Sequence, residues 1–251
     1  MSVSFDRVAE KYDTTRGYPE HIMEDILNAL DRRLKPDDLI LDAGMGTGRF
    51  AAPLQARDYR IVGIDIAGRM IKKAQEKGVE NILRADLLSL PFQDLVFDKT
   101  ISIHVLHLIK HWRDALHEIG RVTKDEFVSV AFNKEESPAQ EIRHAYDRAC
   151  EELGHSMKHP GMRERELPDV LQPDDMKPIV IHEHPVDVKS LIQGFETRTY
   201  SSQWTVPEEI HEEAIELLKE QFGDLDHVQG IERISLIAWN ADKLRKLEPC
   251  D

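Results

Sequence analysis

The stretch LILDAGMGTGRF, Leu39 to Phe50, decides the fold. Its apolar run is typical of a buried strand and stops at Asp42, and glycines follow at positions 44, 46 and 48. Glycines at alternate positions let the backbone turn tightly and let a ligand approach it closely. A helix that begins after such a turn presents free backbone amides to the same ligand. The stretch therefore predicts a strand, a glycine turn and a helix, as in nucleotide-binding folds.

The spacing of the glycines bears on which ligand binds. A dinucleotide-binding turn has the pattern G-x-G-x-x-G, which would need glycine at position 49, where this chain has Arg49. The pattern here is G-x-G-x-G, with an acid two residues before the first glycine. This spacing argues against a nicotinamide-dependent oxidoreductase. A tight turn that binds nothing is the alternative to a ligand site.

Strand-like and helix-like segments alternate on both sides of this stretch. Repeated units of this kind predict a doubly wound α/β fold with a mainly parallel sheet covered by helices. The expected strands are 39–43, 60–65, 81–86, 98–103, 126–132, 178–186 and 233–240. The expected helices are a first one around Phe5 to Tyr12, one after Pro19, and 48–57, 67–77, 112–122, 138–153 and 206–222, the last with a capping box formed by Thr205 and Glu208.

Composition excludes several classes of protein. The 251 residues carry a net charge of −14, which disfavours nucleic acid and anionic membranes as partners. The two cysteines, Cys150 and Cys250, form no metal or disulfide pattern. The first residues lack the apolar centre of a signal peptide, and no stretch has the roughly 20 apolar residues of a spanning helix. We therefore expect a cytoplasmic protein with no membrane or nucleic-acid partner.

At this point the sequence resembles the class I S-adenosylmethionine-dependent methyltransferases, and most of all the ubiquinone/menaquinone-biosynthesis type. The similar motifs are ILDAGMGTGRF, VGIDIAGRMIKKA, ADLLSLPFQDLVFDKTISIHVLHLIKHW, ALHEIGRV and FDRVAEKYD. The resemblance implies a Rossmann-like seven-stranded sheet with its last strand antiparallel, and S-adenosylmethionine as cofactor with S-adenosylhomocysteine as product. One departure is that VTKDEF replaces the family's LKPGG turn before the fifth strand, which affects local geometry.

The resemblance also implies roles for residues that match the motifs. Asp42 would orient the cofactor's amino group, Asp65 would accept from both ribose hydroxyls, and Asp86 would accept from the adenine amino group. Each acid has an alternative role as a turn, cap or surface residue. The full set expected to contact the cofactor is Tyr12, Arg16, Asp42, Ala43, Gly44, Gly46, Gly48, Asp65, Ile66, Met70, Asp86, Leu87 and Ser102.

The fourth strand ends beside the expected methyl group, in the residues SIHV. Enzymes that methylate nucleobases carry an Asp/Asn-Pro-Pro-aromatic or a cysteine-proline element there, and neither is present. His104 is a candidate general base, with a packing role as the alternative, and His107 is a candidate substrate contact. His104, His107 and His111 would share one face of a helix, but no acid at a matching offset supports a metal site.

Residues 134–177 form a long charged connection between the fifth and sixth strands. We expect a single methyltransferase domain over 1–251, with core residues 36–133 and 178–251, N-terminal helices in 3–35, and this connection as a lid-like insertion. The apolar stripe of its helix must pack on something, and we predict that it covers the acceptor site. Surface decoration is the alternative. At the acceptor site we expect substrate contacts from Tyr146 of this helix and from Arg198, Tyr200 and Trp204 of the stretch 197–204.

Together these observations predict an enzyme that transfers a methyl group in line to an oxygen, nitrogen or carbon nucleophile of a small molecule. The implied partners are S-adenosylmethionine and that acceptor, with no metal, and the protein would be a monomer or a homodimer. A non-catalytic S-adenosylmethionine-binding protein and, less favoured, the oxidoreductase stay open as alternatives.

Overall fold

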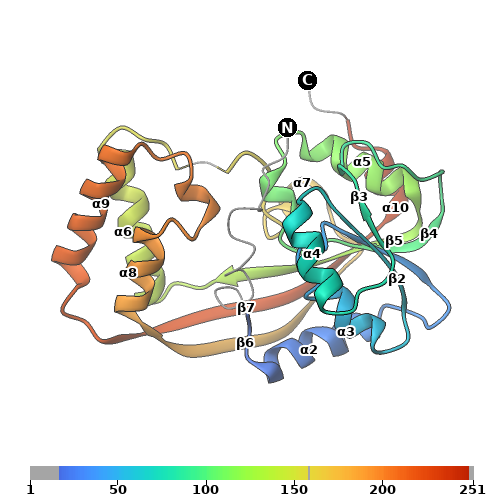
Figure 1. Cartoon of the computed structure of the whole chain (residues 1–251), viewed down its shortest axis with the longest axis horizontal. Coiled ribbons are helices and arrows are strands. Elements are labelled where there is room, and N and C mark those ends of the chain that lie inside the picture. The colour runs from blue at the N-terminus through green and yellow to red at the C-terminus, as the bar shows by residue number, and fades with distance from the viewer. Residues whose placement is uncertain (1–16, 158, 249–251) are drawn as a thin grey trace. The chain divides into compact units, whose positions relative to one another are not determined.

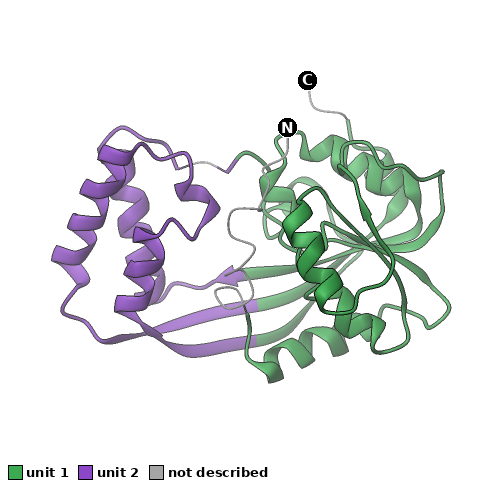
Figure 2. Ribbon diagram, in the orientation of Figure 1, with its two compact units in different colours: residues 1–132, 160–180, 234–251 green, residues 133–159, 181–233 purple. Residues whose placement is uncertain are grey.

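A computed structural model of the chain describes residues 17–157 and 159–248. The helix expected around Phe5 to Tyr12, and with it the predicted cofactor contacts Tyr12 and Arg16, lies outside the described residues. The described chain divides into two compact units. Unit 1 comprises the described residues up to 132 together with 160–180 and 234–248, and unit 2 comprises 133–159 and 181–233, with residue 158 not described (Figure 2).

The sheet has seven strands in the order β3-β2-β1-β4-β5-β7-β6, with the last strand, β7, antiparallel to the rest. This confirms the doubly wound Rossmann-like prediction. The strands are β1 Leu39–Ala43, β2 Arg60–Asp65, β3 Ile82–Arg84, β4 Phe97–Ile101, β5 Thr123–Lys134, β6 Asp175–Asp187 and β7 His227–Asn240. The pairs β1 with β2, β1 with β4, β2 with β3, and β4 with β5 are all parallel.

Helices cover both faces of the sheet in unit 1 (Figure 1). On one face, α2 Glu20–Asp31, α3 Ala51–Gln55 and α4 Gly68–Glu76 pack into one apolar cluster with the strands. On the other, α5 Trp112–Val122, the short α7 Leu167–Val170 and α10 Ala241–Arg245 pack into a second cluster. Since the central strands are buried from both sides, they read as continuous apolar runs such as LIL before Asp42.

In its described residues, unit 2 contains three helices, α6 Pro138–Glu152, α8 Val188–Glu196 and α9 Glu208–Phe222, and a short 3-10 turn, η2 Ser201–Gln203. Their apolar stripes face one another and form a separate core. The stripe of α6, including Ile142 and Tyr146, packs against α8 and α9. The stripe of α6 is therefore buried within unit 2 itself, which removes the reason for placing it on an acceptor site.

The two units differ from the expected division of the chain. Residues 181–233, expected in the core, group with 133–159, while 160–177, expected in the insertion, groups with the core strands. The sequence does not mark this division because three of its boundaries fall inside the strands β5, β6 and β7.

Two local predictions at helices need correction. The capping box of Thr205 is wrong, because α9 begins at Glu208 with Pro207 at the N-cap and no side chain caps it. The three histidines do not share one helix, because His104 precedes the 3-10 turn η1 Leu106–Leu108, His107 lies within it, and His111 is the N-cap of α5.

Candidate cofactor site

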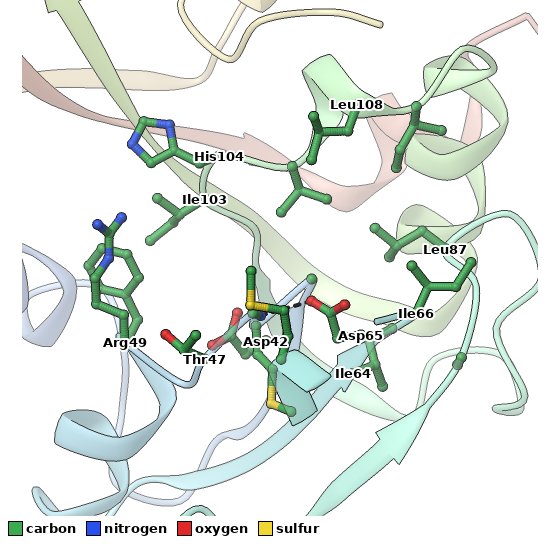
Figure 3. A pocket seen from close by; sticks show the side chains of 18 of the residues that line it. Asp42, Thr47, Arg49, Ile64, Asp65, Ile66, Leu87, Ile103, His104 and Leu108 are labelled. Carbon is green, nitrogen blue, oxygen red and sulfur yellow. Dashed lines mark hydrogen bonds between the residues drawn. The ribbon is translucent and has the colours of Figure 1, made fainter. Parts of the chain in front are cut away.

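A pocket lies in unit 1 at the carboxyl ends of β1, β2 and β4, where ligands bind in doubly wound folds. It encloses about 870 Å³ of empty space, counting the part open to solvent. Figure 3 shows most of the side chains that line it. They come from the glycine turn after β1, the end of β2, α4, the turn after β3, and the segment after β4.

The three glycines of the turn have different roles, although all have positive φ angles. The amide of Gly44 donates to the carbonyl of Ile64 at 2.9 Å, and a Cβ atom at Gly44 would lie 2.5 Å from a methyl of Val105. At Gly46 a Cβ would meet no described atom within 4 Å, and Gly46 lines the pocket. At Gly48 a Cβ would lie 2.9 Å from Val79, and Gly48 is not among the residues lining this pocket. Gly46 is thus the glycine open to a ligand, whereas Gly48 allows close packing.

Asp65 ends β2 and is fixed by the backbone on two sides. Its Oδ2 accepts from the amide of Gly46 at 2.9 Å, drawn as a dashed line in Figure 3. Its Oδ1 accepts from the amide of Ala67 at 2.8 Å. Each carboxylate oxygen has two lone pairs and can accept more than one hydrogen bond. The carboxylate is therefore pre-oriented at the pocket wall.

Asp42 is the buried acid of the site. Its side chain is 3% exposed, and its Oδ2 has no hydrogen-bond partner among the described residues. Burial raises the pKa of Asp42 from 3.8 to about 7; the charge of Asp65 acts in the same direction, and the charge of Arg49 opposes it. A buried acceptor without a donor is costly, and a cationic donor would satisfy it. Asp42 thus fits a ligand ammonium group.

The pocket continues past β2 toward the turn after β3. Ile66, Met70, Asp86 and Leu87 all line it, as expected from the motifs. Oδ1 of Asp86 accepts from the amide of Leu88 at 3.1 Å, which fixes the turn. The apolar side chains and the acid together suit a flat, partly polar ring.

Two other expected contacts have structural roles. Ser102 is fully buried, and its hydroxyl donates to the carbonyl of Ala43 at 2.8 Å. The hydroxyl of Ser129 in turn donates to the carbonyl of Ser102 at 2.7 Å. Neither Ala43 nor Ser102 lines the pocket, because their groups join the ends of β1, β4 and β5 instead.

His104 lines the pocket from the segment after β4, next to Ile103 (Figure 3). Its φ angle of 62° is in the left-handed region, where a residue with a side chain costs about 1–2 kcal/mol. Its ring stacks on Phe132, with the centroids 4.3 Å apart. Strained residues of this kind cluster at functional sites.

The structure shows other contacts for the residues that were expected to bind the substrate. His107 does not line this pocket, and its Nδ1 lies 3.9 Å from a carboxylate oxygen of Glu164. Tyr146 is buried in the core of unit 2, where its hydroxyl shares a 2.6 Å hydrogen bond with Nδ1 of His211. Burial is the main reason why the pKa of this tyrosine is raised well above 10.

Arg198, Tyr200 and Trp204 also make contacts within unit 2. Nη1 of Arg198 donates to the carbonyls of Gln203 and Val206, and the indole of Trp204 donates to the carbonyl of Arg198 at 2.8 Å. The guanidinium of Arg143 lies 5.2 Å from the ring centre of Tyr200. These contacts stabilise the turn between α8 and α9.

Two polar residues that line the pocket and one buried acid that contacts the loop after β4 were not predicted from the sequence. Thr47 and Arg49 line the pocket and belong to the glycine stretch itself, so their position next to Gly46 and Gly48 could have indicated them. Glu164 is the third, and its buried carboxylate accepts from backbone amides of the segment after β4. No motif marks it, since its partners are 58 and 59 positions away.

Within residues 17–157 and 159–248, no helix is long and apolar enough to cross a membrane. In the same part of the chain, no group of three or more His, Cys, Asp or Glu side chains is arranged to hold a metal ion.

The sheet order, the glycine turn and the acids at the ends of β1 and β2 define a Rossmann-like nucleotide-binding protein. A family model described as a methyltransferase domain matches residues 41–127. The matched residues hold the glycine turn and both acids, so the pocket lies in the part of the chain that is similar to a methyltransferase domain.

Curated relatives match part of the chain. The uncharacterized protein MJ0638 of Methanocaldococcus jannaschii is 34% identical over 110 residues, which cover 43% of this chain and 47% of the relative. The demethylmenaquinone methyltransferase of Corynebacterium urealyticum is 31% identical over 127 residues, 49% of this chain and 55% of the enzyme. The chain spans about half the length of these relatives.

Among solved structures, the YcgJ protein from Bacillus subtilis is similar over 87% of this chain and 98% of its own, with a TM-score of 0.54 and 20% identity. This likeness supports the fold.

Proposed function

We propose that the protein transfers a methyl group from S-adenosylmethionine to an oxygen, nitrogen or carbon nucleophile of a small molecule. The observation that carries the proposal is the unpartnered, buried carboxylate oxygen of Asp42 at the glycine turn, beside the ribose-type acid Asp65. A cofactor with one ammonium group and one ribose would meet both acids. The matching methyltransferase domain supports the same assignment.

The residues present fit this cofactor as follows. Asp42 would accept from the ammonium group, and Asp65 would accept from the ribose hydroxyls. Asp86 and the amide of Leu87 would meet the adenine ring. Gly46 would let the methionine portion approach the backbone, because no described side chain fills that space.

When bound, S-adenosylmethionine supplies a methyl group on a positively charged sulfur. The apolar residues Ile103, Val105, Leu108 and Ile109 line the same pocket and would keep water away from the methyl group. Alignment of a nucleophile with the methyl group can lower the barrier by roughly 7–11 kcal/mol. His104, at the pocket wall, would take the acceptor's proton where the acceptor carries one.

From the sequence we further infer that the acceptor is a small molecule, that the protein is cytoplasmic, and that it is a monomer or a homodimer. The lid role of 134–177 likewise remains a prediction. Its first part, up to 159, belongs to unit 2, and the rest belongs to unit 1. Limited proteolysis with and without S-adenosylhomocysteine tests it, since equal cleavage rates within 154–176 would contradict coupling to the cofactor.

Isothermal titration with S-adenosylmethionine, S-adenosylhomocysteine and NADH tests the cofactor assignment. Binding of the first two alone would support it, and binding of NADH alone would favour the oxidoreductase. Transfer of a labelled methyl group to a panel of small phenols, amines, carboxylates and activated carbon acids then separates an enzyme from a binding protein. The Asp65→Ala variant is the control for transfer that does not use this site.

A further inference from the structure

The segment that follows residue 159 contacts the backbone of the loop after β4. The amide of Gly161 donates to the carbonyl of His107 at 3.1 Å. A Cβ atom at Gly161 would lie 2.1 Å from the carbonyl oxygen of Leu106 and 2.4 Å from that of Ile109. Only glycine permits this approach, so the two backbones pack directly on each other. Both segments belong to unit 1.

Glu164 joins the two segments more strongly. Its side chain is buried, and its Oε1 accepts from the amides of Val105 at 2.6 Å and Leu106 at 3.1 Å. Its Oε2 lies 3.9 Å from Nδ1 of His107. Burial opposes ionisation of Glu164, but His107 and the charge of His104 outweigh it and lower the pKa of Glu164 to about 2. The buried group is therefore a carboxylate that accepts from two main-chain amides.

Val105 links this carboxylate to the glycine turn. Its methyl groups would lie 2.5 and 2.7 Å from a Cβ at Gly44, so the valine side chain packs against the bare backbone of Gly44. Five residues of the same loop, 103–105, 108 and 109, line the pocket. Contacts thus lead without a break from Glu164 through Val105 to the turn that would bind the cofactor.

We propose that Glu164 is a positioning residue, whose carboxylate holds the loop 103–109 against the glycine turn and so forms one wall of the cofactor pocket. This inference rests on the proposed function. It is consistent with the left-handed backbone of His104, a conformation that persists only where surrounding contacts fix it.

Two variants separate the hydrogen bonds from the charge. Glu164→Gln keeps an oxygen that can accept from both amides, and Glu164→Ala removes it. Glu166→Ala is the matched control, because Glu166 lies on the same segment, is 43% exposed and pairs with Arg163. Hydrogen exchange of peptides covering 103–109 reports the loop, and titration with S-adenosylhomocysteine reports the pocket.

For Glu164→Ala we expect at least tenfold faster exchange in 103–109, unchanged exchange in β1 and β2, and about tenfold weaker S-adenosylhomocysteine binding. For Glu164→Gln and Glu166→Ala, exchange in 103–109, exchange in β1 and β2, and S-adenosylhomocysteine affinity should all stay within threefold of wild type. A residue that only stabilises the fold as a whole would also speed exchange in β1 and β2 when it is replaced by alanine. If Glu164→Ala does not fold, Glu164→Asp takes its place, because the shorter aspartate side chain cannot reach both amides. S-adenosylhomocysteine should then bind the aspartate variant about tenfold more weakly than Glu164→Gln, and this result would support the proposal.

Wild-type exchange in 103–109 for the alanine or aspartate variant would overturn the proposal. So would wild-type affinity despite faster exchange, because the loop would then not support the pocket. Failure of the wild-type protein to bind S-adenosylhomocysteine would refute the proposed function instead, and the exchange measurement would still test whether Glu164 holds the loop.

Discussion

The amide of Gly46 donates to Oδ2 of Asp65 at 2.9 Å, which joins the turn after β1 to the end of β2. The residue expected to leave space for the cofactor therefore orients the residue expected to bind its ribose. The glycine turn and Asp65 therefore depend on each other, so a substitution at either residue should weaken cofactor binding by the other.

Asp65→Ala should weaken binding of S-adenosylhomocysteine more than tenfold. It leaves the ribose hydroxyls without an ionised acceptor, and hydrogen bonds to charged groups contribute about 1.5–3 kcal/mol each. Titration of the folded variant measures this. Asp94→Ala is the control, because Asp94 is an exposed acid paired with Arg121, and its loss changes the net charge equally. Affinity of Asp65→Ala within twofold of wild type would remove Asp65 from the site.

Gly46→Val should abolish cofactor binding and leave a folded protein. The added side chain would enter space that no described atom fills, at the cost of a left-handed backbone with φ 58°. Gly78→Val is the matched control, because Gly78 has φ 84°, is equally open and does not line the pocket. Both variants should lose about 1–2 kcal/mol of stability, and titration should show lost affinity for Gly46→Val alone. Normal binding by Gly46→Val would mean that the glycines serve only the turn.

The raised pKa of Asp42 predicts a pH dependence of stability. Between pH 3.8 and about 7, the ligand-free folded protein keeps a proton that the unfolded chain has lost. The contribution of Asp42 to the free energy of unfolding therefore falls as pH rises through this window and levels off above it. Denaturant unfolding of wild type and Asp42→Asn across pH 4.5–8 tests this, since the asparagine variant should gain relative stability as pH rises. A constant difference would contradict the assignment.

The same acid predicts how cofactor affinity depends on pH. A ligand ammonium group favours the ionised form of Asp42, so binding of S-adenosylhomocysteine should strengthen as pH rises from 5.5 to about 7, with release of a proton. Titration in buffers of different ionisation enthalpy counts that proton. Asp42→Asn should bind more weakly and without this pH dependence; an equally steep profile in the variant would assign the titration to another group.

Tyr146→Phe should destabilise unit 2 and leave cofactor affinity unchanged. The variant removes a buried hydrogen bond and leaves Nδ1 of His211 without that partner, which costs about 1–3 kcal/mol. Hydrogen exchange of α6 and α9 should increase. Unchanged exchange together with altered acceptor preference would restore the earlier prediction that Tyr146 contacts the substrate.

Local patterns predicted much of unit 1. The apolar stripe of α5 fixed its bounds at 112–122, because an amphipathic period needs no distant partner to be read. β5 and β7 extend beyond the predicted 126–132 and 233–240, to Thr123–Lys134 and His227–Asn240. Their added ends are mostly polar, and pairing with neighbouring strands, which no local pattern shows, makes them strands.

The missed features depend on contacts between distant positions. Glu164 looked like one charge in a charged connection, and only the fold brings it to Val105. Gly48 carried the same signal as Gly46, yet the nearness of Val79 makes it a packing residue. Motifs therefore located the pocket, but they did not separate the residues that line it from those that support it.

Residues 160–180 interrupt unit 2 in the sequence, and this matters for recombination between related chains and for the design of chimeras. Unit 2 is encoded in two separate stretches, and the stretch between them carries Glu164. An exchange of residues 133–233 between related chains would therefore replace the support of the cofactor loop together with unit 2. A chimera that keeps 160–180 from the recipient and takes 133–159 and 181–233 from the donor would preserve the native match between Glu164 and its loop.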